Sequence, residues 1–395
     1  MSAHAPLRLP LLSRGVALGL ALAAFGLYFG ARRFLFGLSS VTHLDDQYPW
    51  GLWIAFDVAT GVALAAGGFT TAALVYVFGK ERFHAVIRPA LLTAALGYTF
   101  VVLGLLADLG RYWAVWHPIL PSMWQGNSVL FEVGICVMAY LSVLYVEFMP
   151  VVIEGLRAWP RLARWQPLLG RLQAFLNRIL FVFILAGIVL SCLHQSSLGN
   201  LMVIAPSKMH PLWYTPLLPL LFLLSAVGVG FPMVIFESLL AARSFRRQPE
   251  LGILGPLARY SVGLLSVYLA FRLGDLTLRE AWPLAFAATT EALFFWAEIG
   301  LGVMLPILLF AQRRVRRSAR GLLAAAALYV VFGVALNRIN VFLLAYHPPY
   351  AESRYVPALG EFAVSIGLVA CLVLVYRLIV SRLPVMPAPE EGMES

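Results

Sequence analysis

Charged residues are scarce in this chain. Asp, Glu, Lys and Arg together make up 12% of its 395 residues, whereas soluble proteins average about 25%. No long polar stretch interrupts the apolar segments, so no separate soluble domain is expected. With 61% hydrophobic residues, the composition excludes an ordinary soluble domain and predicts a protein that crosses the membrane several times.

Cysteine is also rare, and its spacing excludes the usual metal sites. Cys136, Cys192 and Cys371 are isolated in apolar segments, and no CxxC motif is present. Zinc sites and iron–sulfur clusters need several thiolates that are brought together. We therefore predict that this chain holds no metal ion and no iron–sulfur cluster of its own.

Histidines that could face each other inside a helix bundle are lacking as well. His4, His43, His84, His117 and His347 all fall in expected loops or tails. A membrane-bound b-type haem is usually held by histidines that face each other within the bundle. The sequence therefore predicts no haem.

The net charge of +10 does not indicate nucleic-acid binding. The basic residues occur in short runs between apolar segments, and they do not gather in one soluble region. Such runs are typical of the connections between membrane spans. We expect membrane lipid as a partner and no nucleic acid.

About 20 apolar residues are needed to cross the hydrocarbon layer, and the chain offers ten such segments. The prediction is an all-α polytopic membrane helix bundle that forms one domain over residues 1–395. The expected helices are 15–36, 50–79, 88–113, 127–155, 174–195, 212–242, 257–277, 289–312, 319–345 and 357–381.

Alternate connections differ in their basic residues, which predicts the orientation. One set, which includes both termini, holds 21 of the 29 Lys and Arg residues. By the positive-inside rule both termini are expected in the cytoplasm, although Arg32 and Arg33 oppose this locally. Arg8 and Arg14 precede the first apolar segment as in a signal peptide, but no convincing cleavage site follows, so an uncleaved first span is expected.

Polar residues gather near the opposite, periplasmic ends of the expected helices. Charged groups inside hydrocarbon are costly unless they are paired, protonated or hydrated, so they are functional candidates. At about 1.5 Å per residue, Asp57 lies roughly 10 Å below Trp50, and Glu132 roughly 7 Å below Asn127. The other polar residues placed at this level are Asp108, Arg111, Tyr112, Ser128, His194, Gln195, Arg272, Asp275, Asn337, Arg338, Asn340 and Glu361.

Three of these positions are the candidate catalytic residues. Asp108 and Arg111 are spaced to pair on one helix face, for which a purely structural ion pair is an equal alternative. Glu132 has no Lys or Arg in the first turns of its helix, and a carboxyl group buried without a cation holds a proton near neutral pH. His194 is expected at a helix end beside Gln195, where it could bind a carbonyl group.

Two further patterns concern proton movement and helix packing. Glu147, Glu237 and Glu298 are assigned to the cytoplasmic half, where they could form a route for protons. The pairs Gly15/Gly19 and Gly26/Gly30 match the small-xxx-small spacing that lets membrane helices approach closely.

Several blocks of sequence, in order along the chain, resemble a known family. They are PWGLWIAFD (49–57), RPALLTAALGY (88–98), DLGRYW (108–113), NSVLFE (127–132), HQSSLGNLM (194–202) and HPLW (210–213). The resemblance is to the NrfD/polysulfide-reductase family of quinone-interacting membrane subunits, and most of all to the integral membrane subunit of hydrogenase-2-type nickel–iron hydrogenases. It extends from the first expected helix to the last.

The resemblance implies a subunit of the bacterial inner membrane that binds a quinone, either menaquinone or ubiquinone, as its substrate. It implies a periplasmic ferredoxin-like iron–sulfur subunit as partner and, through it, the large and small subunits of a nickel–iron hydrogenase. By matching motif, the resemblance implies that the residues which handle the quinone and its protons are Asp57, Tyr98, Asp108, Arg111, Glu132 and His194. All of them except Tyr98 were also selected above by their depth in the membrane. The alternatives are a membrane anchor for a molybdenum-containing sulfur or nitrogen oxidoreductase and, from another class, a secondary transporter.

Overall fold

The computed structural model describes residues 4–7, 9–10 and 12–387, so Arg8 lies outside the described residues. It contains ten helical spans that are long and apolar enough to cross a membrane, which confirms the predicted all-α membrane bundle. The spans are Arg14–Phe36, Trp53–Val77, Glu81–Asp108, Val129–Arg157, Pro160–Val203, Leu218–Ser244, Leu251–Leu278, Thr290–Ala311, Ala319–Leu344 and Leu359–Arg382.

Seven spans consist mainly of one α-helix. These helices are α1 (Arg14–Phe36), α4 (Ile87–Asp108), α5 (Val129–Arg157), α6 (Gln166–Val203), α7 (Leu218–Ser244), α8 (Leu251–Leu278) and α15 (Leu359–Arg382). Short 3-10 helices occupy connections or extend α4 and α6: η1 (Leu38–Ser40), η4 (Glu81–Val86), η5 (Tyr112–Ala114), η6 (His117–Ile119), η7 (Pro121–Met123), η8 (Pro160–Trp165) and η9 (Pro206–Lys208). The helices α9 (Trp282–Ala285) and α12 (Arg313–Arg316) also lie between spans.

The other three spans alternate between α-helix and the wider π-helix. The second comprises η2 (Trp53–Thr60), α2 (Gly61–Leu64), α3 (Gly67–Ala72) and η3 (Ala73–Val77). The eighth comprises α10 (Thr290–Trp296), η10 (Ala297–Met304) and α11 (Leu305–Ala311), and the ninth α13 (Ala319–Leu328), η11 (Tyr329–Ala335), α14 (Leu336–Ile339) and η12 (Asn340–Leu344). Here η2, η3, η10, η11 and η12 are π-helices, which often occur at functional sites.

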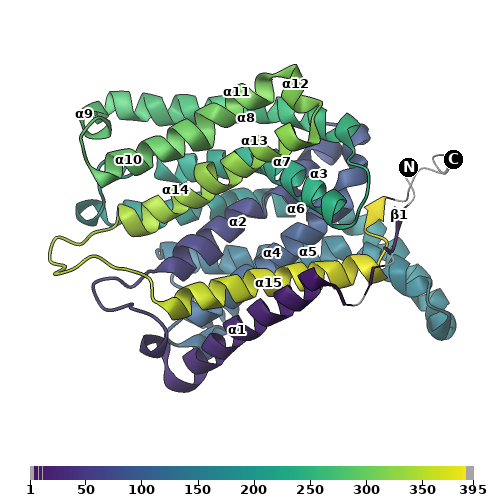
Figure 1. Cartoon of the computed structure of the whole chain (residues 1–395). Coiled ribbons are helices and arrows are strands. Elements are labelled where there is room, and N and C mark those ends of the chain that lie inside the picture. Colours follow the sequence, from purple (N-terminus) through teal and green to yellow (C-terminus); the bar gives the residue numbers. More distant parts are fainter. Residues whose placement is uncertain (1–3, 8, 11, 388–395) are drawn as a thin grey trace.

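Both described ends of the chain lie at the same end of the bundle (Figure 1). There β1 (His4–Ala5) pairs antiparallel with β2 (Met386–Pro387), a two-residue contact that the sequence did not predict. We call this the terminal end and the opposite one the far end. Figure 1 shows α9 and the connection before α15 at the far end.

The second and sixth spans form the buried centre, and α1 lies at the edge. Gly26 of α1 faces Gly367 of α15 so closely that a Cβ atom at 26 would lie 2.5 Å from Gly367 Cα. Gly19 faces Leu374, whereas Gly30 has nothing within 4 Å. The close approach predicted from glycine spacing therefore uses Gly19 and Gly26, one from each pair.

Two helix ends differ from the predicted boundaries in ways that move candidate residues. We predicted that the third helix would continue to 113, but α4 ends at Asp108 because Leu109 adopts an extended conformation (ψ 120°). We predicted that the fifth helix would end at 195, but α6 continues to Val203. Arg111 is thus outside its helix, and His194 is well inside its own.

Candidate functional site

The centre of the candidate site is a buried pair formed by Tyr98 of α4 and His194 of α6. Both side chains are fully shielded from solvent, and the Tyr98 hydroxyl is hydrogen-bonded to His194 Nε2. His194 lies nine residues before the end of α6, which corresponds to about 13 Å of helix. The prediction that it closes a helix end is therefore wrong. Its neighbours in sequence are polar, but they continue the helix because they too point into the bundle.

The partners of the imidazole ring define its tautomer. His194 Nδ1 lies 2.6 Å from the Leu190 carbonyl oxygen, which can only accept a hydrogen bond. Nδ1 must therefore carry the proton, which leaves Nε2 as the acceptor for the Tyr98 hydroxyl. This arrangement presents a neutral imidazole and a phenol as a linked proton-accepting and proton-donating pair.

Several buried oxygen atoms around this pair lack a hydrogen-bond partner among the described residues. They are the Tyr140 hydroxyl, Ser191 Oγ and Gln195 Oε1. The Tyr140 ring centre lies 5.4 Å from that of His194, and the Gln195 amide nitrogen donates to the Val62 carbonyl oxygen at 2.8 Å. Buried polar atoms are rarely left unpaired, so this site is suited to a polar ligand group or water.

Glu132 reaches the same helix from α5. Ser128 caps α5 by accepting a hydrogen bond from Phe131 N at 3.3 Å, which places Glu132 in the first turn. Ser197, three residues after His194, donates to Glu132 Oε1 at 2.6 Å. The expectation that Glu132 is buried is wrong, because its side chain is exposed on the bundle surface. Glu132 is therefore accessible from outside the bundle.

Asp57 belongs to a second group of polar side chains, on the other side of α4. It is buried in η2 and accepts a hydrogen bond from Ser365 of α15 at 2.5 Å. Because η2 is a π-helix, residues at α-helical spacing in this segment do not share one helix face. Trp50 precedes the helix, and the Trp53 indole donates to the Glu361 carbonyl oxygen at 3.0 Å.

Asp108 is accompanied by Arg33 rather than by Arg111. No ion pair joins Asp108 to Arg111 among the described residues, and Arg111 is exposed beyond the end of α4. Arg33 of α1 is buried and donates to the Ala107 and Leu109 carbonyl oxygens, both at 2.5 Å. Its guanidinium is close enough to Asp108 to interact with it electrostatically.

Tyr112 joins this second group through its ring. The Arg33 guanidinium carbon lies 5.5 Å from the centre of the Tyr112 ring, a cation–π distance. Oδ1 of Asp108 is buried and has no hydrogen-bond partner among the described residues. The sequence signal for Arg33 is a charge three residues before the end of an apolar helix, which alone indicates only an interfacial position.

Glu361 connects α15 to the far-end loops. The buried carboxylate accepts hydrogen bonds from the backbone nitrogens of His43 at 3.3 Å and Ala358 at 3.0 Å, and from the Tyr355 hydroxyl. Burial raises the pKa of Tyr355, so its hydroxyl remains a donor at neutral pH. Glu361 therefore has enough partners to serve as a structural residue.

Glu298 lies in a buried network near the far end, so its predicted place in the cytoplasmic half is wrong. It is eight residues from the start of its span at Thr290, and the Trp213 indole, from the loop before α7, donates to it at 2.8 Å. The Asn337 and Asn340 amides donate at 2.8 and 2.9 Å. A carboxylate with three donors is already satisfied, which favours a role in holding helices together.

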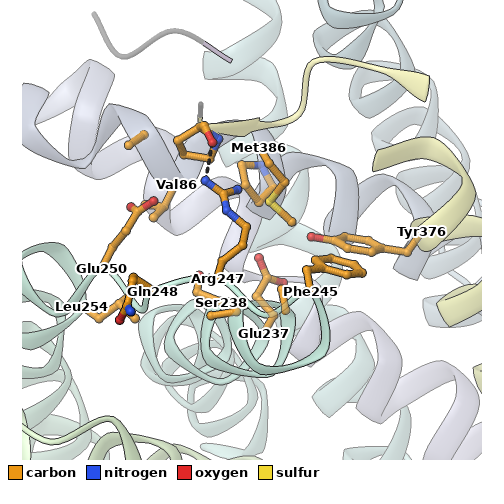
Figure 2. Close-up of a pocket in the computed structure, with 15 residues that line it drawn as sticks. Val86, Glu237, Ser238, Phe245, Arg247, Gln248, Glu250, Leu254, Tyr376 and Met386 are labelled. Carbon is orange, nitrogen blue, oxygen red and sulfur yellow. Dashed lines mark hydrogen bonds between the residues drawn. The ribbon is translucent and has the colours of Figure 1, made fainter. Parts of the chain in front are cut away.

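Glu237 lines a cavity of about 50 Å³ at the terminal end. Figure 2 shows its side chain on the wall of this cavity with Phe245 and Tyr376, and Arg247 donating to the Pro387 carbonyl oxygen near the β2 strand. Oε1 of Glu237 has no hydrogen-bond partner among the described residues. The cavity is large enough for water beside Glu237.

Glu147 is buried deeper in the bundle, ten residues from the end of α5 at Arg157. It packs against Gly187 of α6, where a Cβ atom would lie 2.7 Å from Glu147 Oε1. Its position, about 15 Å of helix from the terminal end, is near the middle of a membrane. Of the three acids assigned to a proton route, Glu237 and Glu147 thus remain on the expected side of the bundle.

The cysteines and histidines do not form a metal site in the part of the chain that the structure describes. No group of three or more His, Cys, Asp or Glu side chains is arranged to hold a metal ion there. Cys136, Cys192 and Cys371 are free and separate.

Comparison with known proteins covers almost the whole chain. The family model described as polysulphide reductase, NrfD matches residues 40–347. A protein of Nitratidesulfovibrio vulgaris that carries no descriptive name is 38% identical over 392 residues, 97% of each chain. The probable Ni/Fe-hydrogenase 2 b-type cytochrome subunit of Escherichia coli K12 is 36% identical over 90% of this chain and 88% of its own. The menaquinone reductase integral membrane subunit of N. vulgaris is 27% identical over 93% and 90%.

Proposed function

This chain belongs to the NrfD family of membrane subunits of oxidoreductase complexes, and we propose that it carries electrons between a nickel–iron hydrogenase and the quinone pool. In this proposal a ferredoxin-like iron–sulfur protein docks at the far end and connects the large and small hydrogenase subunits to a quinone, of which menaquinone is favoured. The far end faces the periplasm of a bacterial inner membrane. The 36% identity to a hydrogenase 2 subunit supports this choice of partner.

The buried Tyr98–His194 pair is the observation that carries the quinone assignment. A quinone needs two electrons and two protons to become a quinol, so its oxygens must meet groups that exchange protons. We place the quinone ring beside this pair, where unpaired oxygens of Tyr140, Ser191 and Gln195 leave hydrogen-bonding capacity unused. On binding, the Tyr98 hydroxyl would turn from His194 Nε2 and donate to one quinone oxygen.

Glu132 is then the proton donor and acceptor that connects this site to the surface. Its carboxylate is exposed, and its bond to Ser197 places it one helical turn from His194. Asp57 and Asp108 belong to the second polar group, near Arg33. They would influence the quinone site indirectly, through the helices α4 and η2 that carry them. Arg111 and Tyr112 follow α4 at the far end, where a docked partner could reach them.

The loop between α4 and α5 supports docking at the far end. Its exposed apolar side chains include Trp113, Trp116, Ile119 and Trp124, with 47 to 64% of each surface accessible. Aromatic side chains are enriched both at protein interfaces and at membrane surfaces. The loop directly follows Asp108, so a protein bound to it would lie close to the candidate site.

We assign no haem to this chain, although the name of one relative includes a b-type cytochrome. His194 is the one histidine buried within the bundle among the described residues, and both of its ring nitrogens have partners. A second histidine that could face it is not present among those residues. The donor set therefore does not fit a haem held by two histidines.

Purification of the complex through this chain tests the proposed partners. After gentle extraction from native membranes, we expect an iron–sulfur protein and nickel–iron hydrogenase subunits to be identified by mass spectrometry. A molybdenum enzyme in their place would retain the quinone site but replace the substrate. A chain that is isolated alone in several mild detergents would favour the transporter alternative.

The Glu132→Gln variant tests the proton-handling role. We expect quinone reduction to fall by about tenfold or more, because the amide cannot exchange a proton, while assembly and dye reduction are unchanged. The matched control is Ser197→Ala, which removes the hydrogen bond but keeps the carboxyl group, and which should retain most of the activity. Normal quinone turnover in Glu132→Gln would remove Glu132 from the mechanism.

The proposal also includes the uptake of protons from the terminal end. If Glu237 and Glu147 deliver protons from the cytoplasm, turnover moves charge across the membrane; if protons exchange only at the far end, turnover is electroneutral. In sealed vesicles with a voltage-sensitive dye, Glu237→Gln should lower the signal per turnover by at least about half, because a route that loses its first proton acceptor conducts poorly. The exposed Glu81→Gln serves as the control, and an unchanged signal in Glu237→Gln would contradict this route.

A further inference from the structure

A second hollow at the terminal end has a different chemistry from the Glu237 cavity. It is an open groove of about 590 Å³ between the end of α7, the segment that follows it, and the start of α13. Eight residues line it, namely Leu239, Ala242, Arg243, Arg247, Pro249, Ala319, Arg320 and Leu323. Three of them are arginines, and none is acidic. We call this surface the arginine groove.

The three guanidinium groups are available for a ligand. Arg243 and Arg320 are exposed and have no hydrogen-bond or ion-pair partner among the described residues. Arg247 donates through Nη2 to the Pro387 carbonyl oxygen, which fixes its side chain, and its other N–H groups have no partner among the described residues. Convergent arginines without a carboxylate attract an anion, and the fork of guanidinium donors matches a phosphate group.

The depth of the groove in the membrane and its apolar lining indicate which kind of molecule bears the anionic group. α7 ends at Ser244 and α13 begins at Ala319, so the arginines lie at the ends of two spans, where lipid headgroups are found. Leu239 is five residues before the end of α7, or about 7 Å deeper, and Leu323 is in the second turn of α13. A ligand with a phosphate at one end and hydrocarbon at the other fits both parts of the groove.

We propose that the arginine groove binds an anionic phospholipid of the leaflet at the terminal end, with its phosphodiester among Arg243, Arg247 and Arg320. The acyl chains pass Leu239 and Leu323 toward the membrane centre. Basic pockets between membrane helices are suited to such headgroups. This site is independent of the proposed electron transfer, because its residues lie at the end opposite to His194.

Native mass spectrometry of the purified complex tests the proposal, with dioleoyl phosphatidylglycerol as the anionic probe and dioleoyl phosphatidylcholine as the neutral probe with the same chains. We expect phosphatidylglycerol to bind at least about 100-fold more tightly, at about 1 kcal/mol for each arginine. The double variant Arg243→Gln/Arg320→Gln should bind it about 30-fold more weakly than the natural chain, since each arginine contributes to attraction of an anionic lipid. Adding Arg247→Gln should reduce binding to the level of the neutral lipid.

The control variant loses the same number of positive charges as the double variant, but at a site away from the groove. Arg161→Gln/Arg164→Gln alters two exposed arginines of η8 at the same end and should leave the affinity unchanged. Equal weakening in this control would mean that only the general charge matters, and would overturn the proposal. So would normal binding in the double variant, which retains Arg247 and its contact with Pro387. Displacement of the lipid by equimolar inorganic phosphate would also overturn it, since a free anion would then be the preferred ligand.

Discussion

Replacement of His194 by glutamine is expected to lower quinone reduction by the intact complex about 100-fold or more, while its catalytic partner continues to reduce a soluble dye. The imidazole accepts a hydrogen bond from the Tyr98 hydroxyl through Nε2. A glutamine side chain at this position can neither take up nor release a proton. Tyr98→Phe removes the other half of the pair and should have an effect of similar size. Both losses should appear in kcat more than in KM, because the pair acts in proton transfer.

The control for this experiment is His84→Gln, which changes a histidine near the terminal end and should leave quinone turnover within about twofold of normal. Assembly of each variant is checked by size-exclusion chromatography of the complex. If the His194 and Tyr98 variants assemble and turn over quinone at the normal rate, the site lies elsewhere, and the second polar group with Asp57 and Asp108 becomes the next candidate.

Gly302→Val is expected to prevent stable folding. Gly302 of η10 faces Gly333 of η11, and a Cβ atom at 302 would overlap the backbone of Phe332 and lie 2.6 Å from Gly333 Cα. Backbone cannot move aside as a flexible side chain can. We therefore expect a loss of more than about 3 kcal/mol, beyond the usual cost of overpacking.

The same helix provides the matched control. Gly300 has nothing within 4 Å of the position that a Cβ atom would take, so Gly300→Val introduces the same side chain without the collision. Fluorescence-detected size-exclusion chromatography after heating should show aggregation of Gly302→Val at much lower temperatures than Gly300→Val. Equal melting of the two variants would show that η10 and η11 can separate at little cost.

The ten spans could be predicted because apolar length and basic connections are properties of local composition. The position of His194 could not. HQSSLGNLM has the polar composition of a helix end, yet His194 and Gln195 are buried among α4, α5 and the second span, and the helix continues to Val203. Which side chains a helix buries depends on its neighbours, and these are distant in sequence.

Arg33 and Glu298 illustrate the same limit for charged residues. The sequence placed Arg111 beside Asp108 by helical spacing, but α4 ends first, and its last carbonyl groups accept hydrogen bonds from Arg33 of another helix. Glu298 lies nearer the far end than predicted, in contact with the indole of Trp213, which is 85 positions away in the sequence. Local spacing predicts a partner only when the helix continues through both residues.

The family resemblance selected a residue that helical spacing did not, because a shared motif carries information about the tertiary structure. Tyr98 had no sequence signal of its own and was selected through the RPALLTAALGY block. The structure places it against His194. Its role in quinone chemistry remains a proposal, which the variants above test.

The contact between α1 and α15 affects how the chain folds during synthesis. The span α1 packs on α15, and Phe36 and Leu359 are about 320 positions apart. At typical rates of synthesis of 5–20 residues per second, about 16 to 65 s pass between the synthesis of α1 and the start of α15. During that interval the bare face around Gly26 is open to lipid or to the insertion machinery. Completion of the bundle is therefore a late event of biosynthesis, and chains that stall before α15 would present an unpaired first helix to membrane quality control.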